Sequence, residues 1–350
     1  MTIPIRSVPC VLALAAMTPT ILAQDLLLIP DSSTDRVWAF SALDGSLVDD
    51  SFIADPGSSG GIDVFNRPLE VLVGASGQLF VSDQFADVVS EFTNDGTFVG
   101  VMSLGGVRNT TIMDNIRGGH VLTLGPDAGD VVVTNSGALN DLVISQKNVK
   151  RLDPIDGSEL EDFAFNRYGG IRGPFDVCEF NGEVLVADEG QDKIVRYTPE
   201  GKFNERFTSA FDYPQLDFPQ QMSVTGSNTL LVCSFSAGFI LEFDTTGVLI
   251  GQYDPGTLDL YRGIHELDNG NLLVTTTTGV FEVTRTGIVV ETEAVGSDFR
   301  YITRVDAPVG FERRAPTKRS ALEIPDPDPR DRDEIIADEL GLDIQEGAGS

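Results

Sequence analysis

The chain has 350 residues, of which 54 are acidic and 24 basic, so its formal net charge at pH 7 is −30. Nucleic acids and anionic membrane surfaces attract proteins through positive charge, so this balance argues against both as partners. Glycine is abundant, with 36 residues, and hydrophobic residues make up 41% of the chain. This composition is typical of a β protein with many turns and a sizeable core.

Residues 1–24 have the order of a secretory signal peptide. Arg6 supplies a positive charge, residues 11–17 (VLALAAM) form a short apolar run, and Ala23 offers a cleavage site. The run is too short to span a bilayer comfortably, and no later segment is long and apolar enough to do so. The alternative is a buried first strand. We expect a secreted or periplasmic protein without a membrane span.

Three stretches of the chain share one pattern. Residues 26–48, 79–100 and 184–207 each contain an apolar strand, an Asp-X3-Asp turn, a second strand, a glycine turn and a third strand. Looser copies occupy residues 130–137, 230–251 and 272–291. Asp side chains cap such turns by accepting backbone N–H groups, and the spacing lacks the final Glu of an EF-hand, so turn capping is favoured over calcium binding.

The glycine turn gives the number of copies, because glycine accepts the positive φ of a tight hairpin. It occurs six times, at Gly45, Gly96, Gly157, Gly201, Gly247 and Gly287. The spacing of roughly 40–60 residues is that of propeller blades.

A leading strand precedes each of units two to six but not the first. These strands are expected at residues 68–73, 119–124, 174–180, 219–224 and 263–267, and a sixth follows the last unit at 301–308. A C-terminal strand that completes the N-terminal blade closes a ring and leaves only short edges. We therefore predict an all-β, six-bladed β-propeller over residues 25–308, preceded by the signal peptide and followed by a tail at 309–350.

Residues 25–308 resemble the NHL-repeat family of six-bladed propellers. The resemblance rests on the pattern Pro-X-polar-Val, then Gly-X-Leu-X-Val-X-Asp, then a strand and a glycine turn, which residues 68–100 and 174–207 match well. The third unit carries an insertion, and the unit at 263–291 lacks the Asp of its turn. The resemblance implies a six-bladed propeller. It does not imply one function, because that fold hosts scaffolds, ligand sensors, lactonases and lyases alike.

The only two histidines, His120 and His265, each follow an Arg by three residues. Aligning the leading strands on this spacing places one polar residue from each blade at the central channel. The ring comprises Glu70, His120, Asp176, Gln221, His265 and Thr303. Arginines precede it at Arg67, Arg117, Arg262 and Arg300, with Arg172 shifted by one residue.

Two interpretations of this ring stay open. In the structural one, the ring residues bond backbone groups around the channel and the arginines pair with carboxylates of neighbouring blades. In the functional one, the arginines and ring residues bind an anionic or carbohydrate-like ligand at the channel mouth. No cofactor is certain, but Glu70 and Asp176 are possible ligands of a divalent metal.

The leading hypothesis is a binding module that takes a small molecule, a carbohydrate or a protein at the channel-mouth face. The alternative is a lactonase-like hydrolase or a lyase, in which His120 or His265 is the general base. Cys178 and Cys233 are expected to be buried free thiols, although a disulfide between them stays open. The acidic, Pro-rich tail is expected to be mostly disordered, with a possible short helix at 332–342.

Overall fold

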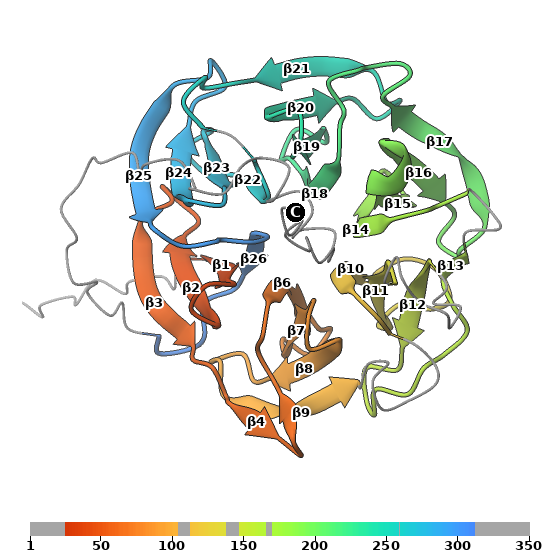
Figure 1. Cartoon of the computed structure of the whole chain (residues 1–350), viewed down its shortest axis with the longest axis vertical. Coiled ribbons are helices and arrows are strands. Elements are labelled where there is room, and N and C mark those ends of the chain that lie inside the picture. The colour runs from red at the N-terminus through yellow and green to blue at the C-terminus, as the bar shows by residue number, and fades with distance from the viewer. Residues whose placement is uncertain (1–24, 104–112, 138–146, 166–169, 259, 312–350) are drawn as a thin grey trace, which may run out of the picture.

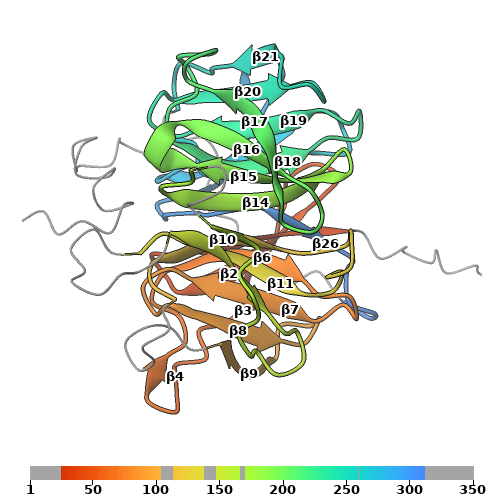
Figure 2. The same cartoon turned by 90° about the vertical axis from the view of Figure 1, so that its right-hand side faces the viewer.

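The structure is a computed structural model, and it describes residues 25–103, 113–137, 147–165, 170–258 and 260–311. These residues form six four-stranded antiparallel sheets, the blades, around a central axis (Figure 1). Figure 2 shows the resulting disk from its edge. The predicted all-β, six-bladed propeller is therefore confirmed. Within the described ranges, no helix is long and apolar enough to cross a membrane.

Each blade has its leading strand next to the axis and its last strand at the rim. From axis to rim, blade 1 contains β26 (Thr303–Val305), β1 (Leu26–Asp31), β2 (Arg36–Ser41) and β3 (Leu47–Ile53), and blade 2 contains β6 (Pro68–Val73), β7 (Leu79–Asp83), β8 (Val88–Phe92) and β9 (Phe98–Ser103). Blade 3 contains β10 (Ile116–Val121), β11 (Val131–Asn135), β12 (Asn148–Leu152) and β13 (Ala164–Phe165), and blade 4 contains β14 (Pro174–Phe180), β15 (Glu183–Asp188), β16 (Lys193–Tyr197) and β17 (Phe203–Ser209). Blade 5 contains β18 (Pro219–Val224), β19 (Leu230–Ser234), β20 (Phe239–Phe243) and β21 (Leu249–Tyr253), and blade 6 contains β22 (Ile264–Glu266), β23 (Leu272–Thr275), β24 (Gly279–Val283) and β25 (Val289–Val295). A small hairpin, β4 (Ser58–Ser59) and β5 (Ile62–Asp63), and a 3-10 turn, η1 (Glu189–Gln191), complete the elements.

The predicted ring closure is also confirmed. Strand β26 pairs antiparallel with β1, so that Val305 lies opposite Leu26 and Thr303 opposite Leu28. The first blade thus takes its innermost strand from the other end of the propeller. The signal peptide and the tail beyond Phe311, with its expected helix, lie outside the described residues, and their bounds stay predictions.

The core lies between the blades. Buried apolar side chains of the described residues form six clusters, each of which joins two neighbouring blades. A seventh cluster fills the hub and comprises Leu69, Phe175, Phe218, Phe235, Leu260 and Tyr301. Cys178 and Cys233 are buried in this interior as free thiols, as expected.

The first Asp of each Asp-X3-Asp turn accepts backbone N–H groups, from Ser33 at Asp31 and from Arg172 and Gly173 at Asp188. The Asp83 carboxylate accepts backbone N–H groups of Asn66, Arg67, Phe85 and Ala86 at 2.8–3.1 Å. The second Asp of each turn, at Asp35, Asp87 and Asp192, adopts a left-handed conformation with φ between 46° and 56°. The interpretation as turn capping is confirmed for these residues.

All six predicted turn glycines have φ between 70° and 86°. They also let neighbouring blades approach closely. A Cβ on Gly247 would lie 2.1 Å from the backbone oxygen of Phe207 in the preceding blade, and Gly96, Gly157 and Gly201 meet the blade before them in the same way. Glycine is therefore required at this position for two reasons: the backbone conformation and the contact between blades.

Replacing Gly247 by alanine is expected to lower the free energy of unfolding by about 2 kcal/mol or more. The left-handed backbone alone costs roughly 1–2 kcal/mol with a Cβ, and the Phe207 backbone must shift as well. Urea unfolding measures the difference. Gly100→Ala is the control, because a Cβ there meets nothing within 4 Å. Equal stability of the two variants would contradict this account of the turn.

Candidate functional site

The leading strands start at one face of the disk, and the loops between the second and third strands of each blade lie at the same face. This face is called the mouth face. Four leading strands carry a bulge close to their start, between Pro68 and Glu70, Ile116 and Gly119, Pro174 and Asp176, and Pro219 and Met222. A bulge re-aims side chains, and here it does so next to the axis.

The structure divides the predicted ring into two levels, which corrects the sequence alignment. Glu70 and Asp176 lie opposite the penultimate residues of β7 and β15, Ser82 and Ala187. His120 lies opposite Val132, two residues farther from the mouth face, at the level of Leu72 and Cys178. Thr303 and His265 lie at this second level too, opposite Leu28 and Leu273. The sequence alignment matched the strands by the three-residue spacing from each Arg to the next polar residue. That spacing is not equivalent in the two strands, because Arg67 precedes β6 whereas Arg117 lies within the bulge of β10.

At the first level, three polar side chains bond backbone groups of other blades. Glu70 Oε2 accepts the N–H of Gly119 at 2.7 Å, and Asp176 Oδ2 accepts that of Met222 at 2.7 Å. Gln221 Oε1 accepts the N–H groups of Ile264 and Ile302 at 2.9 Å each, and its Nε2 donates to the Ile302 oxygen at 2.8 Å. Such bonds satisfy buried polar groups and fasten one blade to the next.

Burial raises the pKa of Asp176 to about 8. Burial, together with the nearby Asp176 carboxylate, also raises the pKa of Glu70 well above its usual range. Gly118 leaves room for this pair, since a Cβ there would lie 2.7 Å from Asp176 Oδ1. Two carboxyl groups that favour the protonated form are poor ligands for a cation. Among the described residues, neither belongs to a set of three ligand atoms close enough to share an ion.

Asp176→Asn is expected to become more stable than the wild type as pH rises. A carboxyl group whose pKa is raised on folding stabilises the native state below its unfolded pKa, near 3.8, and that contribution is lost as pH rises toward 8. The difference in unfolding free energy should therefore grow by about 1 kcal/mol per pH unit over part of this window. Guanidinium unfolding at pH 4 to 8 measures it.

Asp95→Asn serves as a control, because its effect on stability should change with pH in the opposite direction. Hydrogen bonds from Thr93 and Thr97 lower the pKa of this exposed carboxyl, so its contribution is present at neutral pH and lost in acid. Parallel stability curves for the wild type and Asp176→Asn would contradict the assignment of a buried, protonated Asp176.

The two histidines lie in separate surroundings at the second level. His120 Nε2 is 3.6 Å from Glu179 Oε2. Burial alone would raise the pKa of Glu179, but hydrogen bonds from His120, Thr123 and Leu124 lower it to about 2. Burial and the nearby Arg304 lower the pKa of His265 to about 4, so this imidazole is neutral at pH 7.

Closer to the mouth face, three arginines converge on one carboxylate. Asp298 Oδ1 lies 3.0 Å from Arg262 Nε, and its Oδ2 lies 2.6 Å from an Arg300 terminal nitrogen and 4.0 Å from one of Arg67. Ser32, in the β1–β2 loop, accepts a hydrogen bond from Arg300 Nε at 2.6 Å. The exposed fractions are 5% for Arg67, 0% for Arg262 and 1% for Arg300.

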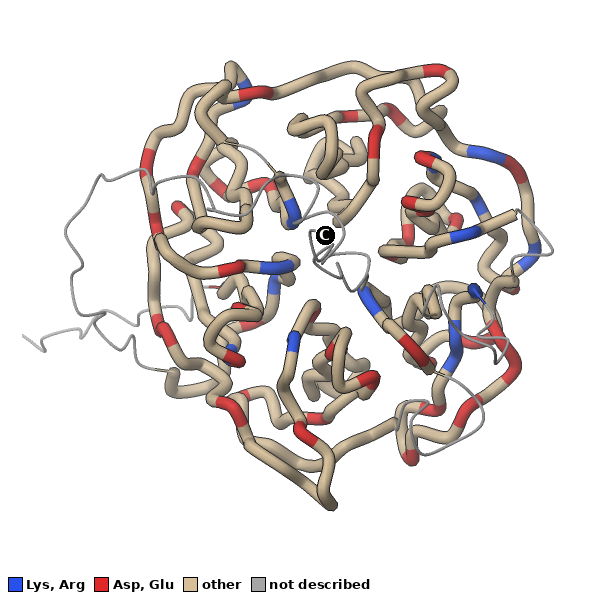
Figure 3. The backbone as a smooth tube through the Cα atoms, in the orientation of Figure 1, with Lys and Arg blue, Asp and Glu red and all other residues tan. Residues whose placement is uncertain are grey.

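Arg117 forms a second part of this group. One of its terminal nitrogens lies 3.3 Å from Glu189 Oε1, and its guanidinium stacks over Phe175, 4.1 Å from the ring centroid. Arg67 and Arg262 stack over Phe85 and Phe235 in the same manner, at 4.5 and 5.0 Å. The name arginine cluster is used here for Arg67, Arg117, Arg262 and Arg300 with their partners Asp298 and Glu189. Figure 3 shows basic positions around the central axis. Arg172 has an exposed side chain, and its backbone N–H bonds to Asp188.

Sequence reasoning missed Asp298, Glu189 and Gln220. Gln220 is wholly buried and lies within the bulge of β18, at the strand position that Arg117 occupies in β10. Glu189 follows the first Asp of its turn, where the equivalent residues Ser32 and Gln84 are not acidic, and Asp298 lies between β25 and β26, so alignment of the units does not reveal either one. The signal that points to them is chemical, because each predicted arginine needs an acidic neighbour in a loop at the mouth face.

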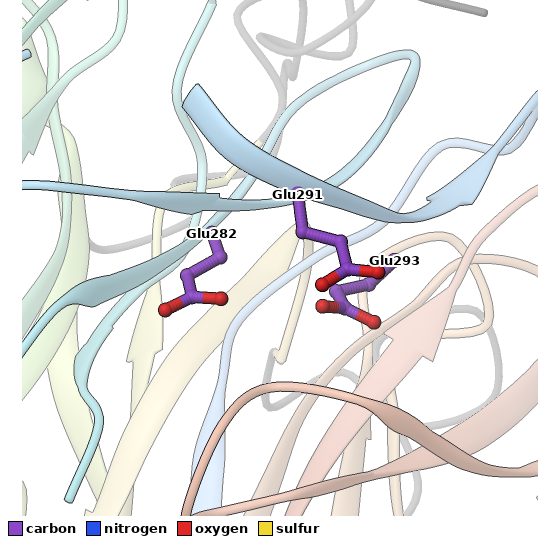
Figure 4. A group of neighbouring side chains, drawn as sticks. All are labelled: Glu282, Glu291 and Glu293. Carbon is purple, nitrogen blue, oxygen red and sulfur yellow. The ribbon is translucent and has the colours of Figure 1, made fainter. Parts of the chain in front are cut away.

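A separate acidic group lies on blade 6, away from the arginine cluster. Glu282 on β24 lies opposite Glu291 on β25, and the carboxyl groups of both and of Glu293 gather on one side of the sheet (Figure 4). Burial and the negative charges of Glu291, Glu282 and Asp44 raise the pKa of Glu293 to about 8. The Glu282 carboxylate already accepts hydrogen bonds from the side-chain amides of Asn269 and Asn271.

No family model matches the chain, and no curated protein matches it either. Solved structures with the same architecture do match. One, a nidogen/laminin complex, has 12% identity and a TM-score of 0.61, over 80% of this chain and 98% of that one. A protein of unknown function from Bacteroides caccae has 13% identity and a TM-score of 0.56, over 81% and 99%. A catalytically inactive virginiamycin B lyase from Staphylococcus aureus with quinupristin has 14% identity and a TM-score of 0.52, over 82% and 94%.

These similarities support the propeller fold alone, because identity is low throughout. The folds they share belong to proteins with different roles, one in a protein complex and one named as a lyase. Function in this chain must therefore be argued from its own site.

Proposed function

We propose that this protein is an exported binding module that recognises an anionic group at its mouth face. The observation that carries the proposal is the convergence of Arg67, Arg262 and Arg300 on Asp298. Guanidinium groups present a fixed fork of donors that suits carboxylate and phosphate. The ligand is accordingly an acidic small molecule, an anionic carbohydrate or an acidic segment of a protein. Export, to the outside or to the periplasm, rests on the signal-like order of residues 1–24.

The electrostatics of the whole chain favour recognition at short range. With a net charge of −30, the protein as a whole repels anions at a distance. Attraction of an anion therefore has to come from a local group of positive charges. The guanidiniums stack on aromatic rings and lie in a water-poor environment, where charge–charge interactions are stronger than in bulk water. A ligand that reaches the arginine cluster would thus be held by few but strong contacts.

Gln220 gives independent support. Its side-chain oxygen and nitrogen are both buried and have no hydrogen-bond partner among the described residues. A buried amide left in this state costs about 1–3 kcal/mol, so an unsatisfied one needs an explanation. A ligand that both accepts from and donates to the carboxamide would remove this cost.

The hydrolase or lyase alternative receives less support from the geometry. His120 and His265 lie at the second level of the hub, where each interacts with its own charged neighbours. A general base must reach the reacting atom of a substrate held in the site. The arginine cluster lies closer to the mouth face than the first level, which is itself two residues nearer that face than either imidazole, so a substrate held by the arginines is remote from both histidines.

The test compares anion binding by Arg262→Gln and Arg196→Gln. Both arginines pair with a carboxylate and stack on a phenylalanine, but Arg196 lies in the third strand of blade 4, away from the hub. Isothermal titration with phosphate, citrate and hexaglutamate should detect binding that weakens with salt, falls at least tenfold in Arg262→Gln and stays within about twofold in Arg196→Gln. Equal affinities in both variants, or no binding of any anion, would refute the proposal.

A lactone-hydrolysis assay on the same samples addresses the alternative. Turnover that is lost in His120→Ala or His265→Ala while anion binding is unchanged would favour the enzyme over the binding module.

A further inference from the structure

We propose that a second site, in a cavity between blades 3 and 4, binds an aliphatic diamine or polyamine. The cavity has a volume of about 580 Å³, within the range of small-molecule sites. Blades 3 and 4 are neighbours in the ring (Figure 1), and the β10–β11 loop and the β16–β17 turn that line the cavity lie at the face opposite the mouth face. The site goes beyond the proposed function, which concerns the other face and a ligand of opposite charge.

The cavity lies beside the outer strand of blade 3, which is short. Strand β13 has two residues and pairs with the first two residues of β12, whereas β17 of blade 4 has seven. The residues before β13 touch β12 at isolated points, through backbone hydrogen bonds from Leu160 to Arg151 and from Phe163 to Val149. A Cβ on Gly201 would lie 2.3 Å from the Phe163 oxygen, so the blade 4 turn approaches closely. A short rim strand therefore leaves space that the neighbouring turn encloses.

Three phenylalanine rings supply the apolar part of the cavity. Phe163 and Phe203 both pack edge-on against Tyr197, with ring centroids 6.2 and 6.1 Å from that of Tyr197, which is fully buried. These two rings are thus held in place before any ligand arrives. Phe203 is 44% exposed and Phe165 is half-buried, so both offer ring surface to a ligand. The face of an aromatic ring attracts a cation and also covers methylene groups.

The charged groups of the cavity favour a cationic ligand. Its described lining contains four carboxylates and two cations, which are Asp127, Glu161, Asp162, Glu200, Arg151 and Lys202. Arg151 forms ion pairs with Asp127 and Asp130, and Asp162 lies 3.1 Å from Lys150 Nζ. These charges are neutralised inside blade 3, which leaves Glu161 and Glu200 against Lys202.

Two carboxylates on separate walls match a ligand with two ammonium groups. Glu161 belongs to blade 3 and Glu200 to the β16–β17 turn of blade 4. A hydrogen bond of 2.7 Å from the Thr198 hydroxyl lowers the pKa of Glu200, so this group is ionised at neutral pH. Ammonium groups donate charge-assisted hydrogen bonds to carboxylates, and the methylenes that join them suit the phenylalanine rings. The net charge of −30 adds a long-range attraction for such a ligand.

Isothermal titration of the complete chain with 1,4-diaminobutane, spermidine and n-butylamine tests the site. At low salt, the diamine and spermidine should bind at least about threefold more tightly than the monoamine, because they engage both carboxylates. Their affinity should fall as salt is added. Absence of binding by all three amines would overturn the inference, and so would equal affinity for the monoamine and the diamine.

Three variants of the lining give the expected signs. Glu161→Gln should weaken diamine binding about threefold, whereas Lys202→Gln should strengthen it about threefold by removing a like charge. Phe203→Leu keeps an apolar side chain but removes the ring, and should weaken binding about two- to fivefold. Unchanged affinity in Phe203→Leu, or weaker binding in Lys202→Gln, would contradict the proposed site.

Glu205→Gln is the matched control for Glu161→Gln. Glu205 is an exposed carboxylate of β17 that does not line the cavity, and its loss should change diamine affinity by less than about 1.5-fold. Equal weakening in the two variants would show that the amines respond only to the overall negative charge, and would overturn the inference. Arg262→Gln should leave diamine binding unchanged, so this site and the proposed function are tested separately.

Discussion

Asp298→Ala is expected to destabilise the propeller by about 3–5 kcal/mol, because removing one partner of a buried ion pair leaves the other charge uncompensated. Here a single carboxylate serves Arg67, Arg262 and Arg300, which come from three different blades. The loss should appear as a lower midpoint of guanidinium unfolding with an unchanged slope.

Asp306→Ala is the matched control. Asp306 lies eight residues later in the chain, just beyond β26, and is exposed. Its loss should change stability by no more than about 0.5 kcal/mol. If Asp298→Ala and Asp306→Ala unfold at the same denaturant concentration, Asp298 does not organise the arginine cluster.

Asp83→Ala is expected to cost about 3–4 kcal/mol of unfolding free energy. The carboxylate accepts four backbone N–H groups, two from the β7–β8 turn and two from the segment that enters β6. Without the carboxylate these four N–H donors stay buried with no acceptor, and each unsatisfied buried donor lowers the free energy of unfolding. One of them belongs to Arg67, so the variant should also bind anions less tightly.

The comparison for Asp83 is Asp95→Ala at the β8–β9 turn of the same blade. Asp95 also accepts hydrogen bonds within its turn, from Thr93 and Thr97, but it is exposed and water can replace it. A loss of about 1 kcal/mol or less is expected there. Similar losses at the two positions would show that burial of the four donors contributes little.

The sequence was sufficient to predict the architecture because each blade repeats the same local signals. Turn glycines such as Gly96 and Gly247 are needed in every copy for the same backbone conformation and the same contact between blades. The absence of a leading strand before Leu26, together with an extra one at Thr303, predicted the closure.

The arrangement of the hub could be predicted only in part. The arginines were identified, but their spacing to the next polar residue misled the alignment. Arg67 lies before its strand, whereas Arg117 lies in a bulge, and a bulge leaves no clear mark in sequence. Asp298 and Glu189 were missed because their partnership depends on which loops meet at the mouth face.

The pairing of β26 with β1 has a consequence for how the chain reaches its native state. Asp25 and Arg304, which bond across this seam, are 279 residues apart. Joining ends so distant costs about 5 kcal/mol of chain entropy, and during synthesis the inner edge of β1 stays uncovered until almost the whole propeller has been made. The first blade to leave the ribosome is thus the last to be finished, and a chain that stops before Thr303 would carry an open seam through which the hub and its charged groups meet water.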